Sequence, residues 1–354
     1  MTFDLQSLVR ENIRRLKPYS SARSEFAGAA EVFLDANENA FGSPAGFGYN
    51  RYPDPLQTAI KKRLASIKSI DPSQIFVGNG SDEAIDLLFR IFCEPGSGEA
   101  IICPPTYGMY RVSADINDVA VREIRLTGEF QLDAAAILAG ISERTKLIFI
   151  CSPNNPTGNL MQRESVIKIA GRFSGIVVVD EAYIDFASKP SMAAELSSLP
   201  NLVILQTFSK AWGMAGLRVG LAFASRAIVD LMNRVKPPYN VSGIAQQAVV
   251  DALDDQESVG QWIAVALQQR SVLVETLSSF DFVETIYPSD ANFILVKVSD
   301  ADAIYNFLLE EKIVVRNRNT VELCEGCLRI TVGTPEENRR LLGAFGKWKK
   351  TSPE

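Results

Sequence analysis

The 354-residue sequence contains no histidine. This absence excludes Ser-His-Asp and Cys-His nucleophilic chemistry, histidine-ligated metals and a histidine general base. If the chain is an enzyme, lysine, tyrosine, aspartate or glutamate must move its protons. The search for candidate catalytic residues is therefore confined to these four types.

Positive charge is also in deficit, because 36 lysines and arginines stand against 42 aspartates and glutamates, a net charge of −6. This balance argues against nucleic acid or an anionic membrane as a partner. No apolar run approaches the length of a transmembrane helix, and the N-terminus lacks the apolar segment of a signal peptide. We therefore expect a cytoplasmic protein that holds any anionic ligand with local arginines.

The five cysteines are an odd number, and three of them lie in or beside apolar runs. We expect them to be small core residues in a reducing compartment, not disulfide partners. The single motif Cys324-Glu325-Gly326-Cys327 has no second cysteine pair and no histidine beside it. It favours a turn between strands over a zinc site, and we predict no metal.

Apolar runs alternate with helical patterns from about residue 73 to residue 224. Three continuous apolar runs, at 146–151, 176–179 and 202–205, are typical of parallel strands buried on both faces. A short amphipathic helix is expected over residues 4–16, and Pro237-Pro238 interrupts the alternation before a second unit. We predict an α/β fold with three parts: an N-terminal arm (1–45), a large domain whose mostly parallel sheet is flanked by helices (46–260), and a small C-terminal α+β domain (261–354).

Polar residues follow the ends of these predicted strands, where open α/β sheets bind ligands. Asp180 ends a fully apolar strand, and a buried carboxylate is unfavourable unless it is paired. Lys210 lies between the hydroxyls of Thr207 and Ser209 and the guanidinium of Arg218. Arginine with small donors suits a phosphate, and lysine forms Schiff bases with aldehydes. Taken alone, this stretch also fits a glycine-rich loop with a solvated lysine.

Other positions have two readings on residue chemistry alone. The Gly78–Glu83 turn precedes a predicted helix and offers amides to an anion, although many α/β turns look similar. Tyr107 either stacks on a planar ring or packs, and for Tyr52 packing is the simpler reading. Arg316 and Arg329 lie on predicted strands and suggest an anion, with a solvated edge arginine as the alternative at 316.

Four motifs then occur in fixed order: Ser-Pro-Asn-Asn-Pro-Thr-Gly (152–158), Asp-Glu-Ala-Tyr (180–183), Thr-Phe-Ser-Lys (207–210) and Gly-Leu-Arg-Val-Gly (216–220). Together they resemble the class I/II aminotransferases of the fold type I pyridoxal-phosphate (PLP) family over nearly the full chain. The resemblance implies that Lys210 holds PLP as a Schiff base and later carries the proton, with Asp180 on the pyridine nitrogen. It further implies that Asn155, Tyr183 and Tyr107 contact the PLP ring. The phosphate of PLP would be bound by Ser81, Asp82, Thr207, Ser209 and Arg218.

A narrower set of motifs is similar to the histidinol-phosphate aminotransferase family: 18–23, 34–39, 51–54, 103–110 and 328–334. The resemblance implies a homodimer with shared sites, in which Tyr52 reaches the PLP phosphate of the partner. Tyr19, Asn155, Arg316 and Arg329 would bind substrate. The implied reaction converts imidazole-acetol phosphate and L-glutamate into L-histidinol phosphate and 2-oxoglutarate, in histidine biosynthesis.

Several other functions remain open at this stage. An aromatic aminotransferase or a threonine-phosphate decarboxylase would share much of this pattern. A PLP-fold regulator is disfavoured, because the chain has neither the length nor the basic charge for a DNA-binding extension. A plain nucleotide-binding α/β protein would have no need of Lys210.

Overall fold

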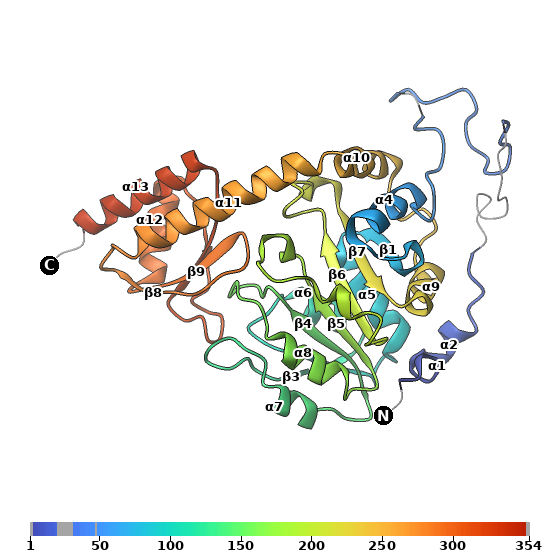
Figure 1. Cartoon of the computed structure of the whole chain (residues 1–354), viewed down its shortest axis with the longest axis horizontal. Coiled ribbons are helices and arrows are strands. Elements are labelled where there is room, and N and C mark those ends of the chain that lie inside the picture. Colours follow the sequence, from blue (N-terminus) through green and yellow to red (C-terminus); the bar gives the residue numbers. More distant parts are fainter. Residues whose placement is uncertain (1–2, 20–30, 47, 352–354) are drawn as a thin grey trace.

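The computed structural model describes residues 3–19, 31–46 and 48–351. Its centre is a seven-stranded sheet in the order β1-β7-β6-β5-β4-β2-β3 (Figure 1). The strands are β1 (Ile75–Asn79), β2 (Glu99–Ile102), β3 (Ala120–Glu123), β4 (Thr145–Cys151), β5 (Ile176–Asp180), β6 (Leu202–Thr207) and β7 (Val219–Ala224). Strands β3, β2, β4, β5 and β6 are mutually parallel, and β7 runs antiparallel to both of its neighbours, β6 and β1. The predicted α/β fold with a mostly parallel sheet is confirmed.

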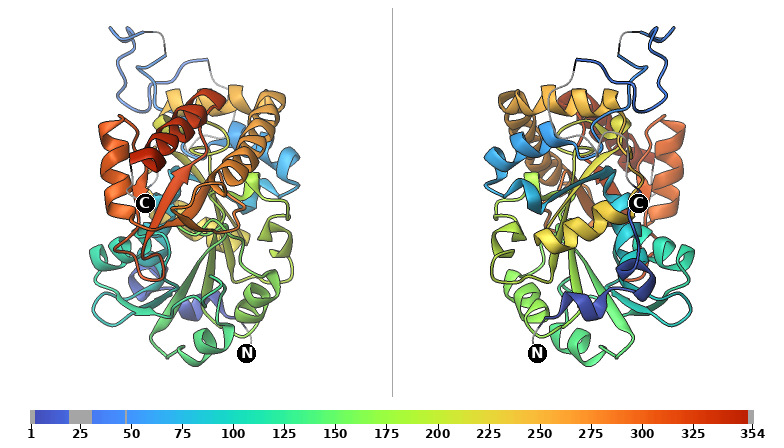
Figure 2. Two further views of the ribbon diagram at one scale, coloured as in Figure 1. Left: turned by 90° about the vertical axis from the view of Figure 1, so that its left-hand side faces the viewer. Right: turned by 90° about the vertical axis from the view of Figure 1, so that its right-hand side faces the viewer.

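Helices cover both faces of this sheet, as the turned views in Figure 2 show. Because side chains alternate along a strand, Val177 and Val179 of β5 enter one apolar cluster while Ile176 and Val178 enter the other. One face is covered by α5 (Ser81–Phe92), α6 (Met109–Ile116) and α9 (Arg226–Val235), and the other by α4 (Thr58–Lys68), α7 (Ala134–Ala139), α8 (Arg163–Ala170) and α10 (Gly243–Leu253). Asp180 follows the same alternation and points toward the α6 side.

A second, four-stranded antiparallel sheet has the order β10-β11-β9-β8. It consists of β8 (Val283–Ile286), β9 (Phe293–Val298), β10 (Arg316–Asn317) and β11 (Cys327–Thr331), packed on α11 (Gln256–Leu277), α12 (Ala301–Glu310) and α13 (Pro335–Thr351). The described residues also form four short 3₁₀ helices: η1 (Pro72–Gln74), η2 (Ile184–Phe186), η3 (Met192–Glu195) and η4 (Ala215–Leu217). Helix α11 runs between the regions of the two sheets (Figure 1), and the boundary proposed at residue 260 lies within it.

The N-terminal segment differs from the expected single helix over residues 4–16. It forms two one-turn helices, α1 (Leu5–Leu8) and α2 (Glu11–Arg14), separated by an extended Val9. The interruption lets the Arg10 amide donate to the Ile91 carbonyl oxygen at 3.0 Å, while Val9 and Ile13 are buried against the α5 side. Docking onto α5 thus outweighs the helical periodicity of the sequence.

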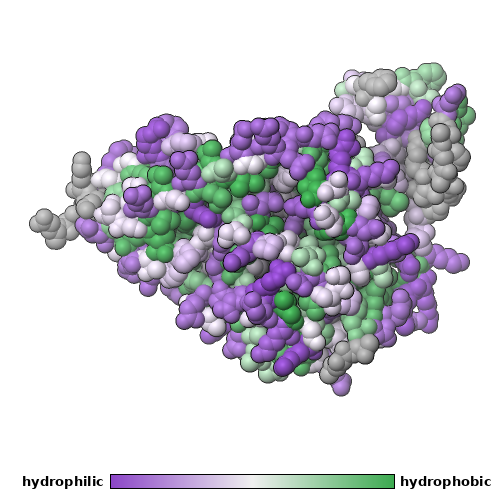
Figure 3. Space-filling view, in the orientation of Figure 1, coloured by the Kyte–Doolittle hydropathy of each residue, from purple (hydrophilic) through white to green (hydrophobic). Residues whose placement is uncertain are grey.

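All five cysteines are buried free thiols. A hydrogen bond of 3.0 Å from the Cys327 amide to the Cys324 carbonyl oxygen confirms the predicted turn. Among the described residues, no helix combines the length and apolar character needed to cross a membrane. Hydrophilic and hydrophobic residues alternate across the face drawn in Figure 3.

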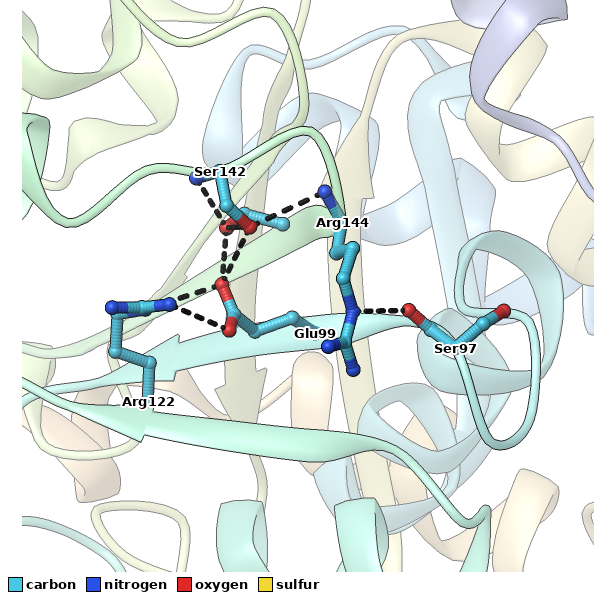
Figure 4. A network of polar contacts seen from close by, with 6 residues as sticks. Ser97, Glu99, Arg122, Ser142 and Arg144 are labelled. Carbon is cyan, nitrogen blue, oxygen red and sulfur yellow. Dashed lines mark hydrogen bonds and ion pairs between the residues drawn. The ribbon is translucent and has the colours of Figure 1, made fainter.

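A polar network closes the amino-terminal end of β2 (Figure 4). Glu99 is 7% exposed, and its carboxylate accepts hydrogen bonds from Arg122 at 3.0 Å, Ser142 at 3.0 Å and Thr145 at 2.6 Å. Burial acts to raise the pKa of Glu99, but these hydrogen bonds outweigh it and hold the pKa below its usual value. The network ties β2 to β3 and β4 at the amino-terminal ends of these strands, opposite to their carboxyl ends.

Candidate active site

A cavity of about 660 Å³ opens at the carboxyl ends of β4, β5 and β6. Most of the predicted site residues line it: Ser81, Asp82, Tyr107, Asn155, Asp180, Tyr183, Thr207, Ser209, Lys210, Arg218, Arg316 and Arg329. Parallel strands end at one edge of the sheet, so residues that are far apart in sequence meet there. The second sheet supplies the two last-named arginines, and the cavity therefore lies between the two sheets.

Asp180 lies at the floor of this cavity and is 3% exposed. The Tyr110 hydroxyl donates to its carboxylate at 2.8 Å, and the Ala182 amide donates at 3.1 Å. Burial raises the pKa of the Asp180 carboxyl to about 6, and these two hydrogen bonds oppose the rise. Such a carboxylate is suited to pairing with a buried cation.

Lys210 extends into the same cavity from the loop that joins β6 to β7. Buried Phe208 anchors this loop, since its amide donates to the Val219 carbonyl oxygen at 3.1 Å and its carbonyl accepts from Met214 at 3.0 Å. Burial and the Arg329 guanidinium lower the pKa of the Lys210 amine. The ammonium nitrogen lies 5.4 Å from the centre of the Tyr183 ring. A lysine whose pKa is lowered is a better nucleophile toward a carbonyl group.

An anion cradle borders Lys210 at the N-terminus of α5. Gly80 has φ of 79° and turns the chain so that the amides of Ser81 and Asp82 begin a twelve-residue helix. The Thr207 and Ser209 hydroxyls lie 3.0 Å apart, and Arg218 donates to Ser209 at 3.4 Å. Helix amides, hydroxyls and a guanidinium together suit a phosphate group.

Arg218 itself adopts a left-handed backbone conformation, with φ of 56°. A side chain larger than glycine rarely occupies this region, and such strain often accompanies function. Its guanidinium also lies 3.4 Å from the Asp82 carboxylate. The conformation therefore directs the guanidinium across the cavity toward the first turn of α5.

The loop after β4 is held in place by the buried side-chain amide of Asn154. Asn154 is fully buried, and its side chain donates to the Pro105 carbonyl oxygen at 2.9 Å and to the Thr157 hydroxyl at 2.7 Å. This places Asn155 at the cavity wall, where its side-chain oxygen accepts a hydrogen bond from Arg329. The two hydrogen bonds of Asn154 thus hold the segment that carries Asn155.

Three arginines gather on the side of the second sheet. Arg316 of β10 pairs in register with Arg329 of β11, and Arg318 follows two residues after Arg316. Burial, and then the charge of Arg318, lowers the pKa of Arg329. No carboxylate among the residues that the structure describes forms an ion pair with any of the three, and the buried Arg318 Nε has no hydrogen-bond partner there. The cluster is suited to an anionic ligand.

Two predicted residues lie outside this cavity. Tyr52 stacks on Tyr239, with ring centroids 4.5 Å apart, beside a separate cavity of about 1030 Å³ next to α10. Tyr19 is 76% exposed and precedes the segment that the structure does not describe. Within this single chain, neither residue is brought to Lys210.

Sequence reasoning missed Tyr110 and Arg318. Tyr110 was part of the motif at 103–110, and its position three residues after Tyr107 at the start of a helix was the available signal. Arg318 follows a two-residue strand, which is too short for its alternation to show which face the side chain occupies. Tyr107 was recognised, and its hydroxyl donates to Asp82 at 3.1 Å.

Comparison with known proteins adds an independent line of observation. The family model described as "Aminotransferase class I and II" matches residues 25–345. Histidinol-phosphate aminotransferase of Parabacteroides distasonis is 54% identical over 346 residues, which cover 98% of this chain and 99% of that protein. The protein of the same name from Cytophaga hutchinsonii is 53% identical over 342 residues, 97% of this chain and 98% of that protein.

Solved structures share the fold at lower identity. Histidinol-phosphate aminotransferase from Sinorhizobium meliloti, in complex with pyridoxal-5′-phosphate, has a TM-score of 0.79 at 23% identity and covers 89% of this chain and 90% of its own. L-threonine-O-3-phosphate decarboxylase from Porphyromonas gingivalis has a TM-score of 0.72 at 22% identity, covering 86% and 92%. These two likenesses establish the architecture alone.

Proposed function

The chain belongs to the class I and II aminotransferases, and we propose that it is specific for histidinol phosphate. In the biosynthetic direction, the amino group of L-glutamate passes to imidazole-acetol phosphate and yields L-histidinol phosphate and 2-oxoglutarate. The observation that carries the proposal is the near-complete coverage of relatives of that name at 53–54% identity. The reaction belongs to histidine biosynthesis.

The cofactor of this class is PLP, and the cavity contains the groups that it needs. The cradle of Ser81, Asp82, Thr207, Ser209 and Arg218 suits its phosphate. Asp180 would pair with the protonated ring nitrogen, because burial raises the pKa of its carboxyl and the Lys210 charge opposes this rise only as a smaller cause. When bound, PLP acts as an electron sink for the bonds at the substrate's amino carbon.

The side chains around the ring each have a separate task in this proposal. Lys210 Nζ would anchor the cofactor covalently and then carry the proton at the amino carbon, a role that its lowered pKa favours. Tyr183 and Asn155 would donate hydrogen bonds to the ring hydroxyl. Tyr107 would stack on the ring. No histidine is needed for any of these steps.

The arginine cluster would bind the anionic groups of both proposed substrates. One pocket must accept the phosphate of histidinol phosphate in one half-reaction and a carboxylate of glutamate in the other, and planar guanidinium groups bind both anions. Arg316 and Arg329 are cross-strand neighbours on β10 and β11, and Arg318 adds a third positive charge. Tyr19 would complete this pocket on substrate binding.

The enzyme acts as a homodimer in the cytoplasm under this proposal. Tyr52 lies outside the cavity of its own chain, and about half of its surface is exposed, so it is available to a partner's cofactor phosphate. The five buried thiols suit a reducing compartment.

The test is a steady-state comparison of histidinol phosphate, phenylalanine and threonine phosphate as amino donors to 2-oxoglutarate. We expect kcat/KM for histidinol phosphate to exceed that of the other two. A higher value for phenylalanine would instead identify an aromatic aminotransferase. Release of carbon dioxide from threonine phosphate would identify a decarboxylase.

A further inference from the structure

We propose that Lys236 is a positioning residue for cofactor binding, because it ties together the two chain segments that carry Tyr52 and Tyr239. The inference rests on the proposed function in one respect, namely that Tyr52 serves the site of a partner subunit. Lys236 immediately follows α9 and is not among the residues that line the catalytic cavity.

The Lys236 ammonium is buried and fully hydrogen-bonded. Its residue is 6% exposed. Nζ donates to the carbonyl oxygens of Pro55 at 2.8 Å, Pro237 at 3.3 Å and Pro238 at 3.1 Å, and to Asn240 Oδ1 at 2.9 Å. A buried charge is tolerated only with such partners, so the bonds hold the two segments together.

The two tied segments carry two stacked rings. Tyr52 precedes Pro55 by three residues, and Tyr239 lies between Pro238 and Asn240. Their rings are 4.5 Å apart and inclined by only 17°. Gln57 reinforces the same junction, because its side-chain amide donates to the Pro55 carbonyl oxygen at 3.0 Å and to Asn240 Oδ1 at 3.3 Å. Lys236 therefore fixes the platform on which Tyr52 rests.

The phosphate cradle of the same chain does not depend on Lys236. Asn240 Nδ2 donates separately to the Val77 carbonyl oxygen at 3.1 Å and to Glu83 Oε2 at 2.8 Å. Glu83 in turn accepts from the Asn79 amide, just before the Gly80 turn. We expect these contacts to remain when the ammonium is removed, because Gln57 also donates to Asn240 Oδ1. The loss of PLP affinity is therefore expected at the partner's site and not in the subunit that carries the substitution.

Lys61 provides a matched control. It is also buried, at 8% exposure, and burial lowers the pKa of both lysines to about 8. Its ammonium makes no hydrogen bond to other described residues, and it affects the Tyr52 segment only through the charge of Asp54. Lys61→Met removes a buried lysine from the same region without removing the tether.

The first experiment compares the full-length variants Lys236→Met, Lys61→Met and Tyr52→Phe. We expect Lys236→Met and Tyr52→Phe each to weaken PLP binding to the apo-protein by about tenfold, the loss of one charge-assisted hydrogen bond. Hydrogen–deuterium exchange of residues 48–57 should increase in Lys236→Met and stay unchanged in Lys61→Met. Unchanged exchange and unchanged PLP affinity in Lys236→Met would overturn the proposal.

Hybrid dimers locate the effect. Each variant subunit is paired with a Lys210→Ala subunit, and the hybrid is purified through two different affinity tags. Only the site of the variant subunit retains Lys210, and this site receives Tyr52 from the Lys210→Ala subunit. We expect the Lys236→Met hybrid to recover the activity of the hybrid between wild type and Lys210→Ala. Recovery of the Tyr52→Phe hybrid without recovery of the Lys236→Met hybrid would refute the positioning role. Failure of the Tyr52→Phe hybrid would refute the shared site, and the positioning role with it.

A second variant keeps the test decisive if Lys236→Met does not fold. Tyr239→Leu removes the stacked ring and leaves the ammonium and its four bonds in place. We expect it to weaken PLP binding and to recover in the same hybrid. Wild-type PLP affinity in Tyr239→Leu would show that the platform has no role.

Discussion

At the scale of single residues, the charge state of Asp180 links cofactor binding to stability. Its folded-state pKa of about 6 is above the ordinary value of 3.8, chiefly because the carboxyl is buried. The folded apo-protein therefore favours the protonated acid and is destabilised once Asp180 ionises. This destabilisation is absent below pH 4, develops between about pH 4 and pH 6, and is complete above pH 6.

Asp180→Asn should consequently stabilise the apo-protein at pH 7.5 by about 2–3 kcal/mol, since two pKa units correspond to roughly that free energy. The advantage should shrink as the pH falls from 6 toward 4, and PLP should bind far more weakly. Urea unfolding across this pH range measures the effect, with the exposed Asp230→Asn as control. Equal stability of wild type and Asp180→Asn at pH 7.5 would contradict the claim that ionised Asp180 destabilises the apo-protein.

Arg329 is expected to serve both half-reactions. Arg329→Ala should lower kcat/KM for histidinol phosphate and for glutamate alike, each by roughly tenfold to a hundredfold, because a hydrogen bond to a charged group is lost. Arg63→Ala, which removes only a surface ion pair to Asp254, is the control. An effect on one substrate alone would exclude a shared anion pocket.

At the scale of secondary-structure elements, the cradle requires the close approach of β7 to the start of α5. A methyl group on Gly220 would lie 2.2 Å from the Ser81 amide nitrogen and 2.3 Å from the Gly80 carbonyl carbon. Both are backbone atoms that cannot move aside without displacing the turn. Gly216, four residues earlier, has no atom within 4 Å of the corresponding position.

Gly220→Ala should therefore lose PLP binding and more than about 3 kcal/mol of stability, through overpacking and displacement of the turn. Gly216→Ala should remain within about 0.5 kcal/mol of wild type. Thermal unfolding and PLP titration of both variants provide the measurement. A Gly220→Ala protein with normal PLP affinity would show that the cradle is not built at this contact.

The Glu99 network is a structural element at the opposite end of β2. Glu99→Gln should reduce stability at pH 7 by about 1–3 kcal/mol, because Arg122, Ser142 and Thr145 lose an ionised acceptor. Since the folded-state pKa of Glu99 is lowered, the difference should begin to shrink as the pH falls below the ordinary value near 4.5 and vanish below the folded-state pKa. The kinetics with histidinol phosphate should not change; altered kinetics would contradict a purely structural role.

The strands and their ends were predictable from the sequence, whereas the packing of the N-terminal segment on α5 and the direction of the Arg318 side chain were not. Continuous apolar runs identify β4, β5 and β6 because both faces of these strands are buried. The extended Val9 between α1 and α2 depends on α5, a segment far along the chain. Arg318 was missed because a strand of two residues has no readable alternation.

At the scale of the whole molecule, residues from two sheets form one cavity. The seven-stranded sheet positions Asp180 and Lys210, and the four-stranded sheet brings Arg329 to Asn155. The motifs indicated the first group from local chemistry, while the meeting of the two groups is a consequence of the chain's path through α11. The roles of all these site residues remain predictions, and those of Tyr19 and Tyr52 also depend on undescribed residues or on a second subunit.

Borohydride reduction of the holoenzyme, followed by peptide mass spectrometry, tests most directly whether Lys210 carries the cofactor opposite Asp180. We predict that the reduced PLP is found on the peptide containing Lys210, and that Lys210→Ala yields no labelled lysine and no transamination. Labelling of a different lysine, or full turnover by the Lys210→Ala variant, would contradict the assignment.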